Sequence, residues 1–130
     1  MNLLDEHVRD DQRALLRQAH IPFRQAGKEL SSSGIQDENI LPLLLRLKRP
    51  TLFTEDRDFF QYQFCHAHYC LAWLDVRNTL IAHYIRRFLR HPAFRHQRQR
   101  MGRVIRVHPA GLDFWQAGSP RLHSTSWPLR

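Results

Sequence analysis

Short apolar runs alternate with segments of helical periodicity over residues 1–90, and this alternation restricts the fold more than any other feature of the chain. Four apolar runs are typical of buried strands, at 2–4, 21–26, 51–54 and 69–76. Of these, the run YCLAWLDV at 69–76 is the strongest. Three further segments have apolar residues at helical spacing, namely 9–19, 37–47 and 78–89. Strand and helix in alternation predict an α/β domain with a mostly parallel sheet.

Acidic residues follow these apolar runs. Asp5 and Glu6 come directly after the first run. Asp56 and Asp58 come shortly after the run at 51–54. Ligands of a parallel α/β sheet bind beyond the carboxyl ends of its strands, so these acids are expected along one edge. Asp37, at the start of a predicted helix, joins them if that helix begins at the same edge. Carboxylates gathered in this way can hold a divalent metal ion against nucleic-acid phosphate.

Positive charge is concentrated toward the C-terminal end of the chain. The net charge is +8, and residues 91–130 contain seven arginines against one acid, which gives +6. Residues 1–90 contain thirteen lysines and arginines against eleven acids, which gives +2. A basic segment beside an acidic cluster suits a polyanionic substrate attracted over long range, although a solubilising surface is the alternative. The arginines expected to contact nucleic acid are Arg86, Arg87, Arg90, Arg98 and Arg100.

Composition indicates the compartment. No apolar run reaches the roughly 18–20 residues that a membrane-spanning helix needs, and the acidic start of the chain is unlike a secretory signal. Cys65 and Cys70 are too few for a disulfide framework. We therefore expect a cytoplasmic protein without membrane insertion. The cysteines and histidines of segment 65–70 fit no common zinc spacing, and a buried thiol with surface histidines is the preferred interpretation.

The chain is long enough for one domain with a genuine core. We expect residues 1–95 to form the α/β unit and residues 96–130 to form a basic C-terminal extension packed on it. Within the extension, 103–108 and 112–116 could pair as an antiparallel hairpin. Residues 117–130 are expected as an extended tail. Trp127 could stack on bases or fasten this tail to the domain, and the second role is preferred.

Three stretches of the sequence resemble, in order and spacing, the motifs of the compact PIN-like nuclease family. They are LLDEH (3–7), SGIQDENIL (33–41) and TLFTEDRDFF (51–60). That family has an opening strand that ends in an L-D-E-N-like motif, an aspartate at a helix start, and a T-x-D-x-D-F motif after the next strand. The most specific part of the resemblance is Thr54 with Asp56, Asp58 and Phe59. The resemblance covers residues 1–95.

The resemblance implies a three-layer α/β/α sandwich around a mostly parallel central sheet. Many PIN-like domains are Mg²⁺- or Mn²⁺-dependent ribonucleases, commonly VapC-like toxins of type II toxin–antitoxin pairs. An RNA substrate and a cognate antitoxin protein are therefore the implied partners, and a homodimer is compatible with the family. The resemblance implies Asp5, Asp37 and Asp56 as metal-pocket residues, with Asp58 as a fourth catalytic acid.

Oxygen ligands alone select a hard cation such as Mg²⁺ or Mn²⁺. Asp5 and Asp56 would be direct ligands, while Asp37 would complete the cage or orient the attacking water. Asp58 could equally cap the helix that follows it. The family's additional helix acid has no clear equivalent here unless Glu6 or Asp75 substitutes. Two hypotheses stay open: a metal-dependent endoribonuclease, or a non-catalytic PIN-like module that binds nucleic acid or a protein partner.

Overall fold

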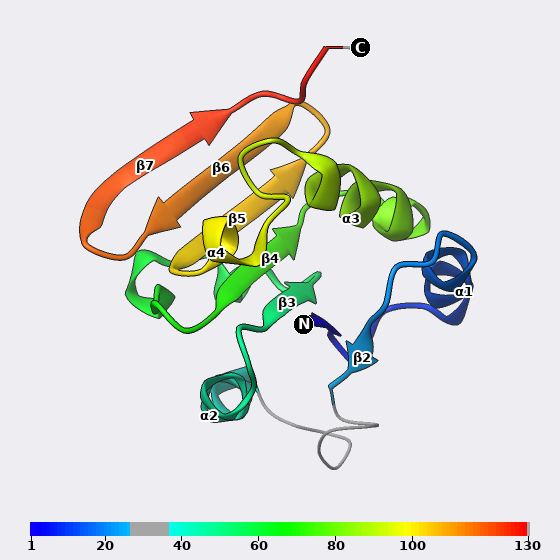
Figure 1. Ribbon diagram of the computed structural model, residues 1–130, viewed down its shortest axis with the longest axis horizontal. Coiled ribbons are helices and arrows are strands. Elements are labelled where there is room, and N and C mark those ends of the chain that lie inside the picture. The colour runs from blue at the N-terminus through cyan, green and yellow to red at the C-terminus, as the bar shows by residue number, and fades with distance from the viewer. Residues whose placement is uncertain (27–36, 130) are drawn as a thin grey trace.

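A single mixed sheet of seven strands forms the centre of the computed structural model (Figure 1), which describes residues 1–26 and 37–129, with the side chains of 37–39 outside the description. The strand order is β2-β1-β3-β4-β5-β6-β7. The strands are β1 (Asn2–Leu4), β2 (Arg24–Gln25), β3 (Thr51–Thr54), β4 (Cys70–Leu74), β5 (Arg103–His108), β6 (Gly111–Gln116) and β7 (Ser119–Thr125). The predicted α/β class is therefore confirmed.

Helices cover both faces of this sheet. The α-helices are α1 (Asp10–Gln18), α2 (Asp37–Arg46), α3 (Ile81–Arg90) and α4 (Gln97–Arg100). Three 3₁₀ turns add η1 (Arg57–Phe59), η2 (Tyr62–Phe64) and η3 (Asn78–Leu80). In Figure 1, α1 and α3 lie on one side of the sheet and α2 lies on the other, an arrangement consistent with a three-layer α/β/α sandwich. Within the described residues, no helix is long and apolar enough to cross a membrane.

Two apolar clusters hold the layers together, one on each face of the sheet. Leu16 of α1 and Ile85 of α3 are buried in the first cluster, against Phe53 of β3. Leu43 and Leu44 of α2 are buried in the second. Successive strand residues alternate between these clusters, as the pleat of a strand requires.

The order of the strands reverses between β1 and β3. Strands β2, β1, β3, β4 and β5 are parallel, and β2 pairs with one side of β1 while β3 pairs with the other. A crevice forms at such a reversal, outside the carboxyl ends of the strands, and it is the usual ligand site of open α/β sheets. Asp5 follows β1, Glu55 follows β3 and Asp75 follows β4, so all three lie along this edge.

The C-terminal residues continue the same sheet. The predicted hairpin is confirmed, because β5 and β6 pair antiparallel from Arg103 opposite Gln116 to His108 opposite Gly111. The expectation of an extended tail over 117–130 was incomplete, since β7 pairs antiparallel with β6. Gly118, at a φ of +81°, makes the tight turn between them. Trp127 is 9% exposed within the first apolar cluster, which confirms its fastening role.

The second predicted strand, 21–26, is much shorter in the structure. The backbone N–H of Ile21 donates to the Leu16 carbonyl at 3.0 Å, so this residue still belongs to the end of α1. Pro22 has no N–H to offer a neighbouring strand. Only Arg24 and Gln25 therefore pair with β1.

Replacement of Phe88 by alanine tests the larger core. Phe88 is fully buried, meets Phe53 edge to face at a centroid distance of 5.8 Å and stacks on Phe94 at 5.3 Å. The variant should lose about 3–5 kcal/mol of unfolding free energy, because it loses apolar burial and leaves a cavity. Urea unfolding should show a lower midpoint at an unchanged m-value. Leu122→Ala, at a side chain 45% exposed on β7, is the control and should lose about 1 kcal/mol or less. Equal losses would contradict this account of the core.

Candidate functional site

One row of side chains crosses the sheet on the face toward α2. Strand register places Thr54 beside Trp73, Trp73 beside Arg106, and Arg106 beside Asp113. Asp5 and Ser124 extend this line at its two ends, because Asp5 continues β1 beside Thr54 and Ser124 pairs with Asp113. From β1 to β7 the transverse row therefore comprises Asp5, Thr54, Trp73, Arg106, Asp113 and Ser124. Residues far apart in the sequence thus share one face of the sheet.

The hydroxyl group of Thr54 organises the end of the row at the β1–β3 crevice. Thr54 is fully buried, and its Oγ1 donates to Oδ2 of Asp5 at 2.9 Å. The same Oγ1 accepts the backbone N–H of Asp56 at 3.1 Å. The N–H of Asp5 in turn donates to the Phe53 carbonyl at 2.9 Å, which extends the β1–β3 ladder by one residue. Thr54 therefore fixes both the Asp5 carboxylate and the start of the Asp56 turn.

Asp56, rather than Asp58, caps the helical turn that follows β3. Its Oδ1 accepts the backbone N–H of Asp58 at 2.9 Å, at the beginning of η1. The helix-capping role considered for Asp58 thus belongs to Asp56. Asp58 is exposed in the first turn of η1, and its carbonyl accepts from Gln61 at 2.8 Å. Of these two predicted site residues, Asp56 is the one held against Thr54.

Glu55 is a site residue that sequence reasoning did not select. Burial raises the pKa of its carboxyl above the ordinary value, and the negative charge of Asp5 raises it further, while Arg9 and His7 act in the opposite direction. Glu55 therefore lies within electrostatic reach of Asp5. Its position directly after a buried strand and before Asp56 was the available signal. We call Asp5, Thr54, Glu55 and Asp56 the sheet-edge site.

The structure shows less of the other two predicted metal ligands, Glu6 and Asp37. The Glu6 carboxylate lies 3.8 Å from Nε2 of His7, and Gln25 donates to the Glu6 backbone carbonyl at 3.2 Å. Asp37 begins α2, but its side chain lies outside the described residues. Across the described side chains, no three His, Cys, Asp or Glu residues lie close enough together to hold a metal ion. Burial also raises the pKa of the Cys70 thiol to about 12, so this sulfur is an apolar core group.

The chemistry of the sheet-edge site suits a hydrated Mg²⁺ ion better than a closed protein cage. Mg²⁺ retains several waters and is often bound by one or two carboxylates together with substrate phosphate. Asp5 and Asp56 come after neighbouring strands, and the Thr54 hydroxyl contacts the Asp5 carboxylate and the Asp56 backbone N–H. These residues therefore fit the ion in donor type.

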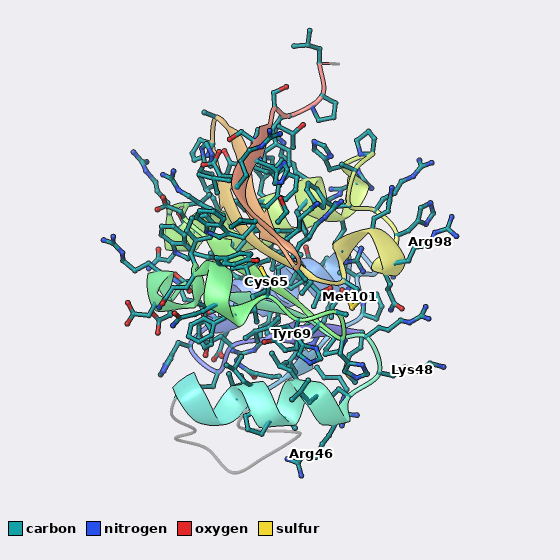
Figure 2. The ribbon with its side chains drawn as sticks, turned by 90° about the vertical axis from the view of Figure 1, so that its left-hand side faces the viewer. Arg46, Lys48, Cys65, Tyr69, Arg98 and Met101 are labelled. Atoms are coloured by element: carbon teal, nitrogen blue, oxygen red, sulfur yellow. The ribbon has the colours of Figure 1, made fainter. Side chains whose placement is uncertain are left out.

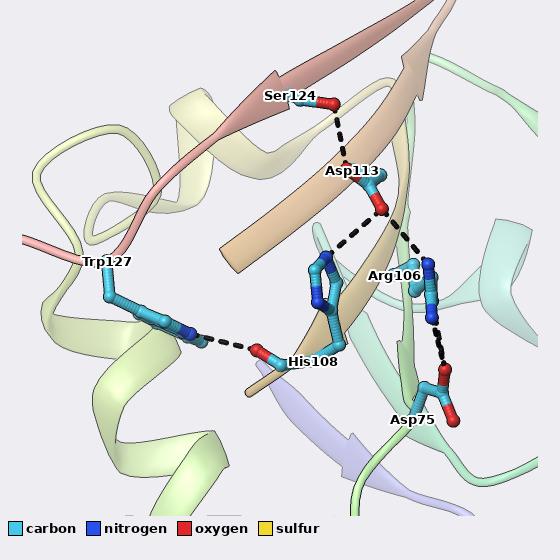
Figure 3. A network of polar contacts seen from close by, with 6 residues as sticks. All are labelled: Asp75, Arg106, His108, Asp113, Ser124 and Trp127. Carbon is cyan, nitrogen blue, oxygen red and sulfur yellow. Dashed lines mark hydrogen bonds and ion pairs between the residues drawn. The ribbon is translucent and has the colours of Figure 1, made fainter. Parts of the chain in front are cut away.

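Arg106 neutralises the other half of the row, as Figure 3 shows. Its Nε and Nη2 contact Oδ2 of Asp75 at 2.9 and 2.8 Å. Its Nη1 donates to Oδ2 of Asp113 at 3.3 Å, and Ser124 donates to the other oxygen of Asp113 at 2.7 Å. Nε2 of His108 lies 3.1 Å from Asp113 without forming a hydrogen bond. Asp75 is therefore committed to Arg106, which makes it a poor substitute for the missing acid.

Aromatic side chains lie beside the middle of the row. Phe60 packs against Trp73 at a centroid distance of 5.6 Å and against Trp115 at 6.4 Å. Tyr62 contacts Trp115 at 5.9 Å and is 37% exposed. Arg106 also lies over the Trp73 ring, 5.5 Å from its centroid. This group of four rings gives the face toward α2 a partly exposed aromatic surface next to the sheet-edge site.

The five predicted nucleic-acid arginines do not form one surface. Arg86, Arg87 and Arg90 line a single pocket on α3, over the other face of the sheet. Arg98 is exposed on α4 (Figure 2). Arg100 is 4% exposed, and its guanidinium donates to Oγ1 of Thr51 at 3.0 Å and to the Phe94 carbonyl at 2.8 Å. Arg100 is therefore part of the protein interior, while the α3 arginines remain available to a ligand.

Comparison with known proteins returned nothing: no protein-family model, no curated protein and no solved structure matches this chain. The function is therefore inferred from the arrangement of the chain's own residues. That arrangement consists of an acidic strand edge, an adjoining aromatic surface and a separate basic pocket.

Replacement of Glu55 by glutamine tests the electrostatics of the sheet-edge site. Because the folded-state pKa of Glu55 is raised above 4.5, stability is lost as pH rises from this ordinary value through the folded pKa. With chelator present, Glu55→Gln should raise the melting temperature by about 1–3 °C at pH 8. The gain should vanish at pH values below the ordinary glutamate pKa. Asp11→Asn is a control of opposite sign, because its hydrogen bond from Arg9 lowers the Asp11 pKa. A destabilised Glu55→Gln protein at pH 8 would contradict the prediction.

Proposed function

We propose that this chain is a metal-dependent endoribonuclease of the PIN-like class that uses Mg²⁺ or Mn²⁺ at the sheet-edge site. The observation that carries the proposal is the buried Thr54 hydroxyl, which holds the Asp5 carboxylate and the Asp56 backbone at the β1–β3 crevice. This crevice is where open α/β sheets bind their ligands. The order in which the motifs of Asp5, Asp37 and Asp56 occur in the sequence supports the same function.

The residues of the site have distinct roles in this proposal. A bound divalent ion would supply an activated water and neutralise charge on the phosphate oxygens. Asp5 and Asp56 offer carboxylate oxygens to the ion, and Thr54 holds the Asp5 carboxylate in one orientation through its 2.9 Å hydrogen bond. Burial and the charge of Asp5 raise the pKa of Glu55, which would hold or accept a proton at its carboxylate. Asp37 and Asp58 would be the further acids of the set on the motif resemblance alone.

The aromatic surface supports single-stranded RNA as the substrate class. Unpaired bases bind proteins chiefly by stacking on aromatic rings, and the partly exposed rings of Tyr62 and Trp115 lie on the same face as the Asp5 carboxylate. The toxin role and the cognate antitoxin partner rest on the motif resemblance alone.

A second candidate function is a non-catalytic module that binds nucleic acid or a protein partner. One observation favours it, and it concerns the acid that could have replaced the family's additional helix acid. Asp75, which could have supplied a further acid, is paired with Arg106. In this case the fold and the basic surface would be retained without metal chemistry.

Substitution of the two central aspartates separates these functions. With purified protein, Mn²⁺ and a single-stranded RNA, Asp5→Asn or Asp56→Asn should lower the cleavage rate at least about a hundredfold, because each removes a charged ligand. Mn²⁺ should also raise the melting temperature of the parent protein but not of either variant. Asp11→Asn removes an exposed acid of α1 and serves as the matched control, with cleavage within about twofold of the parent.

Two results would contradict the nuclease function. Cleavage that persists in both aspartate variants would point to another enzyme or another site. A parent protein that binds RNA but shows neither cleavage nor a Mn²⁺-dependent rise in melting temperature would favour the non-catalytic module.

A further inference from the structure

A basic pocket lies between α3 and the C-terminal segment of the chain. Its volume is about 590 Å³. The α3 side contributes His83, Arg86, Arg87 and Arg90, and the opposite side contributes Trp127 and Pro128. The four α3 residues follow the spacing i, i+3, i+4 and i+7, so one face of the helix carries them all. The opposite face of α3 is buried in the core.

Hydrogen bonds hold the C-terminal wall of the pocket in place. Nδ1 of His91 accepts the backbone N–H of Ala93 at 3.0 Å, so its Nε2 carries the proton and donates to the Ser126 carbonyl at 2.9 Å. Nε1 of Trp127 donates to the His108 carbonyl, also at 2.9 Å. The wall is thus fastened both to α3 and to β5. Hydrogen bonds therefore fix the shape of the pocket, whereas a helix face that only contacts solvent needs no such wall opposite it.

The pocket offers positive charge rather than a stacking surface. The guanidinium of Arg87 lies 4.3 Å from the centroid of the Trp127 ring and 5.5 Å from that of Tyr84. These cation–π contacts position Arg87 and occupy the face of an indole that is only 9% exposed. A base cannot stack on a ring that is covered in this way. The ligand that fits is therefore an oxyanion.

Among the described residues, no acid compensates the positive charge of the pocket. No carboxylate is among the described residues that line it, and neither Arg86 nor Arg90 forms an ion pair with another residue in the described part of the chain. Like charges spaced at i and i+4 destabilise a helix by about 0.2–0.5 kcal/mol per pair. The helix dipole favours cations in the last turn, but it does not explain the lack of any acid on this face.

We propose that the basic pocket binds backbone phosphate groups of a single-stranded RNA, as a second anchoring point outside the sheet-edge site. The inference deepens the proposed ribonuclease function and takes its ligand class, RNA, from it. The pocket lies on the α1–α3 side of the sheet, whereas the transverse row faces α2 (Figure 1). The phosphates bound there are therefore distinct from the phosphate at the sheet-edge site, and they contribute affinity without base specificity.

The test is an RNA-binding titration without cleavage. Chelator is present throughout, and the probe is a fluorescein-labelled oligouridylate of about 12 nucleotides. The double variant Arg86→Gln with Arg90→Gln should bind about tenfold or more weakly at about 0.1 M salt, with a salt slope smaller by about 1.4, because two phosphate contacts are lost. Glutamine is a good helix former, so the thermal melt should stay close to that of the parent.

A charge-matched control identifies the pocket as the cause. Arg46→Gln with Lys48→Gln removes the same charge at the end of α2, where both side chains are exposed (Figure 2). This control should change the affinity about twofold or less, since long-range charge alone is screened by salt. Equal losses in the two double variants would overturn the proposal and assign the effect to net charge.

Two further outcomes would overturn the proposal. In the first, the Arg86 and Arg90 double variant binds RNA as tightly as the parent, and pyrophosphate raises the melting temperature of the parent but not of this variant. That result would assign the pocket to a free phosphate compound. Poly-glutamate that binds the parent as tightly as the RNA does would assign it to an acidic protein segment. Binding is measured here without cleavage. Either result therefore says nothing about the Asp5 and Asp56 substitutions, which test the nuclease function separately.

Discussion

The hydrogen bond from Thr54 to Asp5 connects the parts of the molecule on which the acidic edge depends. A hydroxyl has one proton to donate and lone pairs to accept with, and Thr54 uses both at a position closed to water. Its donation orients the carboxylate beyond β1, and its acceptance begins the turn that Asp56 then caps. One buried side chain thereby links the end of β1, the end of β3 and η1. A residue of the same shape without the hydroxyl would lack the side-chain hydrogen bonds that link these three segments.

The transverse row divides into two electrostatic halves. Toward β1, burial and, to a smaller extent, the negative charge of Asp5 raise the pKa of Glu55. Toward β7, the guanidinium of Arg106 lies between Asp75 and Asp113 and pairs with both. Arg106 therefore offsets part of the negative charge in this half of the row. Over the opposite face of the sheet, Arg86 and Arg90 of α3 form no ion pair with an acid in the described part of the chain. A polyanion would meet attraction at α3 and, without a cation, repulsion at the crevice, which is the charge pattern expected if a metal ion mediates the contact with phosphate.

The amino-acid sequence predicts the order of strands and helices through residue 90, because each element there carries its own apolar periodicity. It also places Asp5, Asp56 and Asp75 at strand ends, since strand ends are local features. The partners of these acids are not local: Thr54 meets Asp5, and Arg106 meets Asp75, only through strand register. Arg100 could not be recognised as buried, because its burial depends on oxygen acceptors supplied by distant segments.

Strand β7 shows the same limit and has a consequence for the behaviour of the protein at high concentration. Its sequence is polar and lacks the alternation that marks a half-buried strand, so it was not predicted, yet it forms one border of the sheet. A border strand of seven residues could serve as a template for another chain to pair with. Pro120 removes one donor from that border, and the exposed Arg121 places a charge on it. The polar and proline-containing sequence that prevented the prediction of β7 thus also protects the sheet against aggregation through its edge.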